Sequence, residues 1–334
     1  MEISKKPEKA LPVMRDRHLY GFIALCLLIS LPALIFAYLI EKAWETAERD
    51  RADRRALLVA REISAEIGRQ VEDNAHIVEA LAKLVEIRGT LDSARLQKMA
   101  TAQRAPFIPF SSLIYIANAA GIAVAYDPPV DKFGTPNIGT DYSDRDYYKE
   151  LVRTGGHGPA IIGPVRMGRR AHAPNVQTAA AAHDPKGNFW AFTQGSIDLA
   201  TVQPDVEQIL AEVPDLKVVA ASKEGKAFIH PDKNALEEMR DLSKYPLFQP
   251  PENLKGEFRT GIDEEKVAVR AAVLPISQRE INWRVVVYQP ESLVQADAAV
   301  MRRQTWTVLG AALSAGFILA GLVFWKGSGT EGRE

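Results

Sequence analysis

An arginine and two tyrosines stand close together near the middle of the chain, at Arg145, Tyr147 and Tyr148. A guanidinium group presents a planar pair of donors to a carboxylate, and aromatic walls exclude the water that would compete for it. These residue types therefore predict a pocket for a small anionic molecule. The alternative is that Arg145 pairs with Asp144 or Asp146 on a helix surface while both tyrosines belong to the core.

Short strand-like runs surround these residues and would position them. They stand at residues 112–117, 122–126, 160–165, 175–183 and 188–197, with a short helix expected at 146–153. The turns Asn118-Ala119-Ala120-Gly121 and Asp184-Pro185-Lys186-Gly187 join neighbouring runs as hairpins. The pattern predicts a mostly antiparallel sheet. Tyr115 and Tyr126, on the first two strands, could line the same cavity, although aromatic residues on strands are more often core.

A second set of strand-like runs begins near Leu216. It comprises residues 218–222, 227–230, 256–260, 266–274 and 283–288. Both sets open with a strand, a glycine-containing turn and a strand, and both return with long strands. The two halves therefore look related, although the identity between them is too slight to establish a repeat from the sequence alone.

A long helical pattern without proline precedes both sets, from about residue 41 to 88. Its apolar residues recur at helical spacing: Val59, Ile63, Ile67, Val71, Val78, Leu81 and Val85. This spacing puts them on one stripe of a stalk helix, with charged residues on the remaining surface. Asn74 falls on the stripe, where it could set the register of a paired coil or form a wet seam. The helix could pair with a partner chain or lie on the domain that follows.

Two uncharged apolar runs, residues 19–40 and 305–325, lie toward opposite ends of the chain. Each exceeds the roughly 20 residues with which a helix crosses a hydrocarbon core of about 30 Å. The first is too long for the apolar region of a cleaved signal peptide. Basic residues crowd the segment before it, and this predicts a cytoplasmic amino terminus, residues 1–18. Residues 41–304 would then lie outside and 326–334 inside, although two arginines just before the second run argue mildly against this.

Composition and the motifs that do not occur argue against several classes of function. Charged residues make up 25% of the chain, yet the formal net charge is -1, so we expect no nucleic acid partner. The single cysteine, Cys26, lies in the first apolar run, so the domain outside would contain no disulfide. The histidines lack metal-ligand spacing, and we expect no metal and no cofactor. No serine-hydrolase elbow, phosphate loop or dinucleotide turn occurs, and we expect no enzyme, with a hydrolase triad assembled from distant residues as the alternative.

The stretch after the first hairpin reads Asp144-Arg145-Asp146-Tyr147-Tyr148. Together with the long helix and the two sets of strands between two apolar spans, this stretch resembles the double Cache sensor family. That family occurs in bacterial transmembrane histidine kinases, diguanylate cyclases and chemoreceptors. Further stretches that resemble it are Asp184-Pro185-Lys186-Gly187, Gly195-Ser196-Ile197-Asp198-Leu199 and Trp283-Arg284-Val285-Val286-Val287. The resemblance covers about residues 41 to 300.

The resemblance implies an α+β fold with a long stalk helix and two PAS-like antiparallel-sheet modules, flanked by two transmembrane helices. Its parts would be the stalk (41–100), a membrane-distal module (101–215) and a membrane-proximal module (216–295). It also implies a sensor in a bacterial inner membrane, with a periplasmic or extracellular domain whose distal module holds a small ligand.

The same resemblance bears on the ligand. Relatives that bind amino acids carry an aspartate where this chain has Ser196, and often a tryptophan where it has Tyr147. Asp198 lies on the same face of its strand as Ser196, but about 6.6 Å further along. These departures favour a simple organic acid over an amino-acid-like ligand. A basic cluster of Arg166, Arg169, Arg170 and His172 could help to hold an anion or could be a solvated hairpin tip.

The second apolar run carries Ala312, Gly316 and Ala320 at intervals that allow two helices to approach closely in a lipid bilayer. We therefore expect a homodimer. Residues 326–334 are too few to fold as a kinase, cyclase or chemotaxis domain, so the output would come from a longer chain or from a separate membrane signalling partner. The predicted function is that of a membrane-anchored sensor of a small ligand, and a protein-binding scaffold without signalling is the alternative.

Overall fold

The computed structural model describes residues 13–103, 113–131, 133–167, 174–252, 256–276 and 278–330. The chain divides into two compact units. The sheet-containing unit holds residues 53–291, and the helical unit holds residues 1–52 together with 292–334. Helix α1 (Val13–Arg88) contributes to both units, whereas α6 (Glu291–Thr330) belongs to the helical unit except for its first residue. The expected α+β fold is confirmed.

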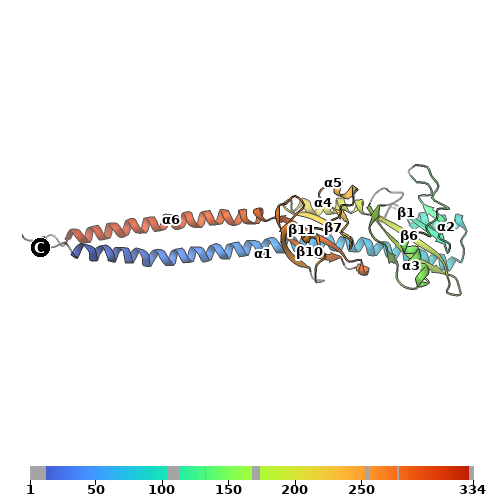
Figure 1. The fold of residues 1–334 in the computed structure, drawn as a ribbon, viewed down its shortest axis with the longest axis horizontal. Coiled ribbons are helices and arrows are strands. Elements are labelled where there is room, and N and C mark those ends of the chain that lie inside the picture. Colours follow the sequence, from blue (N-terminus) through green and yellow to red (C-terminus); the bar gives the residue numbers. More distant parts are fainter. Residues whose placement is uncertain are drawn as a thin grey trace, which may run out of the picture. The chain divides into compact units, whose positions relative to one another are not determined.

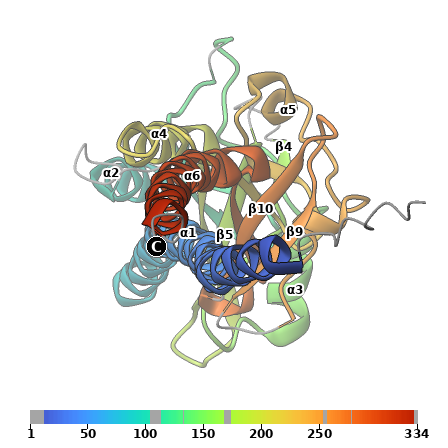
Figure 2. The ribbon, with the colours of Figure 1, turned by 90° about the vertical axis from the view of Figure 1, so that its left-hand side faces the viewer.

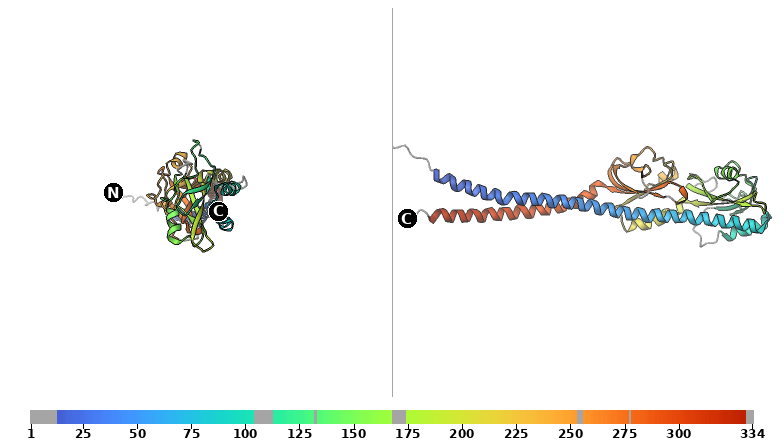
Figure 3. Two further views of the ribbon diagram at one scale, coloured as in Figure 1. Left: turned by 90° about the vertical axis from the view of Figure 1, so that its right-hand side faces the viewer. Right: turned by 90° about the horizontal axis from the view of Figure 1, so that it is seen from below.

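The helical unit consists of α6 and the first part of α1, which run side by side (Figures 1 and 3). Both helices are long and apolar enough to cross a membrane, with mean hydropathies of 2.7 and 1.6 in their most apolar windows. The Trp306 Nε1 donates a hydrogen bond to Glu41 Oε2 at 3.1 Å, and Arg302 lies 3.7 Å from the same carboxylate. Almost none of the residues in these most apolar segments is buried.

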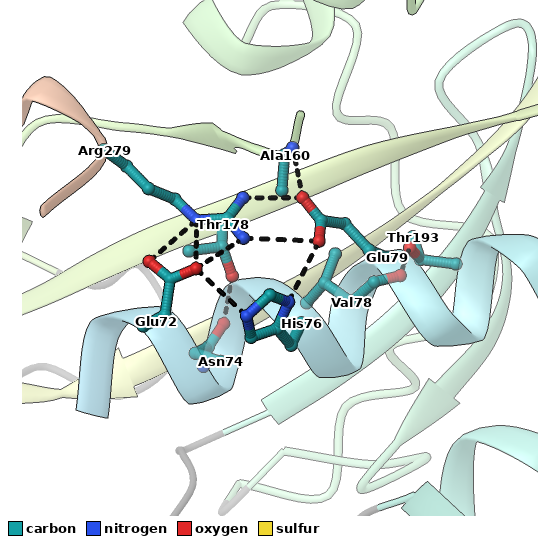
Figure 4. A network of polar contacts seen from close by, with 9 residues as sticks. All are labelled: Glu72, Asn74, His76, Val78, Glu79, Ala160, Thr178, Thr193 and Arg279. Atoms are coloured by element: carbon teal, nitrogen blue, oxygen red, sulfur yellow. Dashed lines mark hydrogen bonds and ion pairs between the residues drawn. The ribbon is translucent and has the colours of Figure 1, made fainter. Parts of the chain in front are cut away.

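The predicted apolar stripe of α1 is buried in the sheet-containing unit. All seven of its residues are buried: Val59, Ile63, Ile67, Val71, Val78, Leu81 and Val85. Asn74, also buried, accepts a hydrogen bond from the Thr178 hydroxyl of the first sheet (Figure 4). Gly195 permits this approach, because a Cβ there would lie only 3.1 Å from Asn74 Oδ1. The helix therefore lies on the domain that follows it, and Asn74 binds that domain.

The first sheet is antiparallel and follows the order β2-β1-β6-β5-β3, with β4 also paired to β5. Its strands are β1 (Leu113–Asn118), β2 (Ala123–Asp127), β3 (Ile161–Ile162), β4 (Arg166–Met167), β5 (Pro174–His183) and β6 (Phe189–Asp198). Helices α1 and α2 (Ser93–Gln103) pack on one face, and α3 (Asp146–Thr154) packs on the other. We call this sheet with α2 and α3 the first module.

The second sheet repeats this order as β8-β7-β11-β10-β9, again antiparallel. Its strands are β7 (Lys217–Ala221), β8 (Ala227–Ile229), β9 (Glu257–Ile262), β10 (Ala268–Ile276) and β11 (Trp283–Pro290). The short helices α5 (Lys233–Glu237) and η2 (Pro246–Phe248) stand between β8 and β9. We call these elements the second module. Turn η1 (Leu199–Thr201) and helix α4 (Gln203–Ala211) connect the modules, and α4 lies on a different side of the sheets from α3 (Figure 2).

The first hairpins of the two modules have turns of the same conformation. Its glycine is Gly121 in the first module and Gly225 in the second, with φ of 88° and 86°. A Cβ at these positions would lie 2.8 Å from Ser143 N and 2.9 Å from Ser243 N, so both turns require glycine. The backbone hydrogen bonds of the two turns also correspond. The residue directly after each glycine, Ile122 or Lys226, forms an antiparallel bridge with the aspartate two positions before the serine, Asp141 or Asp241.

A loop of the second module reaches α1 through Arg279. This residue lies in turn η3 (Gln278–Glu280), between β10 and β11, and has a φ of 48°. Its guanidinium binds Glu72 Oε1 at 2.9 Å and Glu79 Oε1 at 2.6 Å (Figure 4). Glu79 Oε1 also accepts a hydrogen bond from Ala160 N of the first module at 2.7 Å. One carboxylate on α1 therefore connects both modules.

Each module contains one tryptophan. Trp190 on β6 packs beside α1 and α2, and Trp283 on β11 lies 4.9 Å from the Phe228 ring. The other three of the five tryptophans in the sequence stand at positions 44, 306 and 325, outside residues 53–291.

Candidate ligand-binding site

Four tyrosines pack together on the face of the first sheet that lies against α3. The Tyr115 ring stacks on Tyr126 at 5.2 Å and on Tyr142 at 4.5 Å between centroids. The hydroxyl groups of Tyr115 and Tyr147 lie 2.6 Å apart, and the Tyr142 hydroxyl donates to the Tyr126 hydroxyl at 3.2 Å. All four side chains are buried. We call these four residues the tyrosine cluster.

The four tyrosines come from two strands, a loop and a helix. Tyr115 on β1 and Tyr126 on β2 are directly opposite in the antiparallel ladder, so their side chains leave the sheet on one face. Tyr142 is held over that face because its N–H donates to Gly121 O at 2.9 Å. Tyr147 stands in the first turn of α3, and the buried Leu151 one turn later fixes which side of α3 faces the sheet.

Burial controls the protonation of the cluster. It raises the pKa of Tyr115 well above the usual value for a phenol, and the hydroxyl of Tyr147 adds to this effect. Burial likewise raises the pKa of Tyr147, although its hydrogen bond to Tyr115 and the charge of Arg145 oppose the shift. Both hydroxyls are therefore neutral at physiological pH and can donate or accept a hydrogen bond.

Arg145 directly precedes α3 and is largely buried, with 13% of its side chain exposed. Its Nε lies 3.9 Å from Asp144 Oδ1, which is too far for a hydrogen bond. Within the described part of the chain, this Nε is a buried donor without a hydrogen-bond partner. Of the two pairings expected as the alternative, the one with Asp144 is present as this long ion pair, whereas the Asp146 carboxylate binds Arg166. A buried cationic donor of this kind is suited to receive an anionic acceptor.

Tyr148 packs against the hydrophobic core that contains the tyrosine cluster, but its hydroxyl points to the first hairpin. Its hydroxyl donates a hydrogen bond to Ala119 O, in the turn between β1 and β2, at 2.9 Å. Its ring lies 5.7 Å from Phe192 and is half-buried. Tyr148 therefore ties α3 to the first hairpin. Of the predicted basic cluster, Arg166 is exposed and pairs with Asp146, whereas Arg169, Arg170 and His172 lie outside the described residues.

Ser196 and Asp198 lie on the same face of β6 as the tyrosine cluster. Ser196 pairs with Leu113 across the ladder, two positions from Tyr115, and is buried. Its hydroxyl accepts a hydrogen bond from Gln194 Nε2 at 2.9 Å. Asp198 ends the strand and is half-buried. The structure thus places Ser196 beside the cluster and Asp198 at the edge of the same face.

Two residues of this face were not among the predicted site residues. Gln194 pairs directly with Tyr115 in the ladder and is buried, and Tyr142 completes the ring stack. Alternation along β6 from Ser196 points to Gln194, so this residue had a signal in the sequence. Tyr142 stands in a segment without periodicity. Among the described residues, no group of three or more His, Cys, Asp or Glu side chains could hold a metal ion.

The sequence matches no protein-family model and no curated protein. However, the fold of this chain is similar to several solved structures. The ligand-binding domain of the Pseudomonas fluorescens chemoreceptor CtaA, in complex with L-isoleucine, covers 75% of this chain and 97% of its own, with 17% identity and a TM-score of 0.56. For the periplasmic sensory domain of the Campylobacter jejuni chemoreceptor Tlp1, the shares are 74% and 98%, with 13% identity and a TM-score of 0.58. For the ligand-binding domain of the Pseudomonas aeruginosa PAO1 amino acid chemoreceptor PctC, in complex with GABA, the shares are 71% and 99%, with 16% identity and a TM-score of 0.55.

In this chain, two sheets of identical strand order pack on a single long helix. The fold is the one that the resemblance to the double Cache family implied, and the ligand-binding or sensory domains of these chemoreceptors share it. In this fold the tyrosine cluster and Arg145 belong to the first module. The resemblance seen in the sequence implied a ligand in that module.

Proposed function

We propose that the double Cache domain of this chain is an extracytoplasmic sensor that binds a small anionic ligand in its first module. The observation that carries the proposal is the buried Arg145 Nε, which has no hydrogen-bond partner among the described residues. The neighbouring Tyr147 hydroxyl offers a neutral donor, and Gln194 and Ser196 offer polar atoms on the facing strand. A carboxylate bound to Arg145 would therefore meet donors from both α3 and the sheet.

The ligand class follows from the charges of this face. Isoleucine and GABA, bound by the chemoreceptors CtaA and PctC, each carry a carboxylate and an ammonium group. An ammonium group would need an acidic partner close to the carboxylate-binding arginine. Ser196 is neutral, and Asp198 lies at the strand end. We therefore propose a simple organic acid as the ligand, and amino acids are an outcome of the test.

The proposed sensor is anchored in a membrane by both long helices. The apolar windows of α1 and α6 are exposed, and lipid is the solvent that suits such a surface. The basic residues before the first span support a cytoplasmic amino terminus. Ligand binding would then shift an equilibrium between two states of a homodimer, to the extent that the ligand prefers one of them. The output would pass to a kinase, a cyclase, a chemotaxis domain or a separate membrane partner.

The test is thermal unfolding of the full chain in detergent against organic acids, amino acids and amines. A ligand present at 100 times its dissociation constant stabilises the folded state by about 2.7 kcal/mol and so raises the melting temperature. We expect a shift with organic acids. Arg145→Ala should weaken their binding by about tenfold to hundredfold, because a hydrogen bond to a charged group contributes about 1.5 to 3 kcal/mol.

Arg153→Ala is the matched control, because Arg153 lies on the same helix but is exposed and pairs with Glu150. It should leave organic-acid binding unchanged. Undiminished binding in Arg145→Ala would place the ligand elsewhere, and equal losses in both variants would point to a general weakening of α3.

A further inference from the structure

The second module contains a cavity of about 470 Å³. Its walls come from β7, the end of β8, the segment between β8 and β9, the β9–β10 turn and β11. The side chains that matter for its chemistry are His230, Arg240, Tyr245, Glu264 and Tyr288. None of them belongs to the tyrosine cluster or to the site around Arg145.

This cavity occupies the place in the second module that the candidate site occupies in the first, as the first hairpins establish. Asn118 N donates to Ile122 O at 3.0 Å, and Ser222 N donates to Lys226 O at 2.9 Å. Four residues after these acceptors stand Tyr126 in the first module and His230 in the second. His230 is therefore the counterpart of Tyr126.

The remaining walls correspond in the same way. Bridges join Ile122 to Asp141 and Lys226 to Asp241, and four residues after these aspartates stand Arg145 and Tyr245. Both donate their N–H to the residue three positions earlier, at 3.1 and 3.0 Å.

The last strand completes the correspondence. Phe192 pairs with Ala117 on β1, and Arg284 pairs with Ala221 on β7. Counting four residues along each strand makes Tyr288 the counterpart of Ser196. The cavity therefore has the location of a ligand site but different chemistry, because Tyr245 replaces the arginine.

The charge of the cavity is negative. Its lining holds four carboxylates and three lysine or arginine side chains besides His230. Arg240 binds Glu264 Oε2 at 2.8 Å and Asp232 Oδ2 at 3.0 Å, so one cation serves two carboxylates. Glu264 Oε1 is buried and accepts no hydrogen bond from the described residues. This oxygen is an acceptor with charge that the protein does not fully compensate.

His230 does not supply the missing charge. Its Nδ1 accepts a hydrogen bond from Asp232 N at 3.0 Å, so the neutral ring carries its proton on Nε2. That Nε2 lies 3.6 Å from Glu264 Oε1, beyond hydrogen-bond distance. The His230 side chain is only 7% exposed, and such burial favours the neutral ring.

We infer that this cavity is a second ligand site, and that it takes a small molecule with a primary ammonium or guanidinium group. The N–H groups of the ligand bind Glu264 Oε1, and the aromatic side chains of Tyr245 and Tyr288 line the space for the rest of the cation. A carboxylate ligand would instead meet Glu264 at close range. The site goes beyond the first-module function and does not depend on it.

The test is calorimetric titration of the full chain in detergent with putrescine, agmatine and ethanolamine, and with succinate as the anionic probe. We expect at least one amine to bind. Glu264→Gln keeps the shape of the side chain but removes its charge, and should weaken that amine about tenfold or more. Arg145→Ala should leave amine binding unchanged, which separates this site from the first.

Two further variants keep the result decisive. Glu237→Gln is the matched control, because Glu237 is an exposed glutamate on α5 of the same module and is not among the residues that line the cavity; amine affinity should stay within about twofold. Lys244→Glu replaces a positive charge with a negative one at an exposed wall residue and should tighten amine binding about two- to fivefold, even if Glu264→Gln fails to fold. Absence of amine binding in the unaltered protein, or amine binding that is lost in Arg145→Ala and kept in Glu264→Gln, overturns the inference.

Discussion

His230 is a buried titratable residue that faces charged groups from more than one segment. Asp232 and Arg240 stand between β8 and β9, and Glu264 stands in the β9–β10 turn. Burial lowers the pKa of His230, whereas the charge of Glu264 acts in the opposite direction. The lowered pKa means that the unfolded chain takes up its proton more readily than the folded chain.

The sign of the pH dependence follows from this shift. The contribution of His230 to stability is fully present above the unfolded pKa of about 6.5 and is lost as the pH falls through the lower folded pKa. We expect the melting temperature of the protein to fall between pH 7 and pH 5. In His230→Tyr, which carries the residue of the first module, that fall should be smaller. Equal slopes for the two proteins in calorimetric scans would show that another group titrates.

The candidate sites show what residue types alone can and cannot predict. Arg145 and Tyr147 were predicted because an arginine beside aromatics suggests a carboxylate, and the structure places both at one end of α3. Tyr142 and Glu264 could not be predicted, because each lies in a turn or loop without periodicity, and Tyr142 is held at its site by a hydrogen bond from its N–H to Gly121 O in the first hairpin. Whether Arg145 binds a ligand stays a prediction.

Arg279 is the point at which loop, helix and both modules meet (Figure 4). Its positive φ of 48° costs on the order of 1 kcal/mol for a residue other than glycine. The surrounding contacts must offset this cost. The side chain is largely buried and binds two carboxylates of α1, Glu72 and Glu79, in a geometry that surface ion pairs rarely hold.

We therefore expect Arg279→Ala to lower the free energy of unfolding by about 1 to 3 kcal/mol. The control is Arg69→Ala, because Arg69 pairs with Glu66 and Asp73 on the exposed side of the same helix and should cost at most about 0.5 kcal/mol. Urea unfolding of both variants measures the difference. A loss in Arg279→Ala no larger than that of the control would mean that the contact between modules contributes little.

Elements with a local pattern were predicted, and long-range pairing was not. The stripe of α1 follows from helical spacing, and the first hairpin follows from a turn that requires glycine. Of the stretch expected as one strand at 160–165, only β3 at residues 161–162 is a strand, and β4 pairs with β5 at a separate point just beyond that stretch. Strand order joins segments that are far apart in sequence, and only the family resemblance could supply it.

At the scale of the whole molecule, two modules of one topology differ in the residues at equivalent positions. Tyr126 and His230 correspond, as do Phe192 and the buried Arg284. In the second module Arg284 donates a hydrogen bond to Ser222 O at 2.6 Å and another to Phe248 O, where the first module has an aromatic ring. Conservation of backbone contacts with exchange of side chains explains why the repeat is hard to see in the sequence.

The proposed membrane topology gives a prediction at the same scale. Cys26 is the sole cysteine, so a Cys26→Ser background allows single cysteines to be placed at will. In spheroplasts of a bacterial host, a membrane-impermeant maleimide should label Lys186→Cys, in the exposed β5–β6 turn, and should spare Lys5→Cys. Labelling of position 5 with protection of position 186 would reverse the orientation.

The distribution of tryptophan makes each module separately visible by fluorescence. Trp283 lies in the second module near its aromatic neighbour Phe228, and Trp190 lies in the first module beside α1. Replacing Trp44, Trp306 and Trp325 by phenylalanine would leave one emitter in each module. Removing Trp190 or Trp283 in turn then assigns every spectral change to one module, so that two ligands added to one sample could be followed independently.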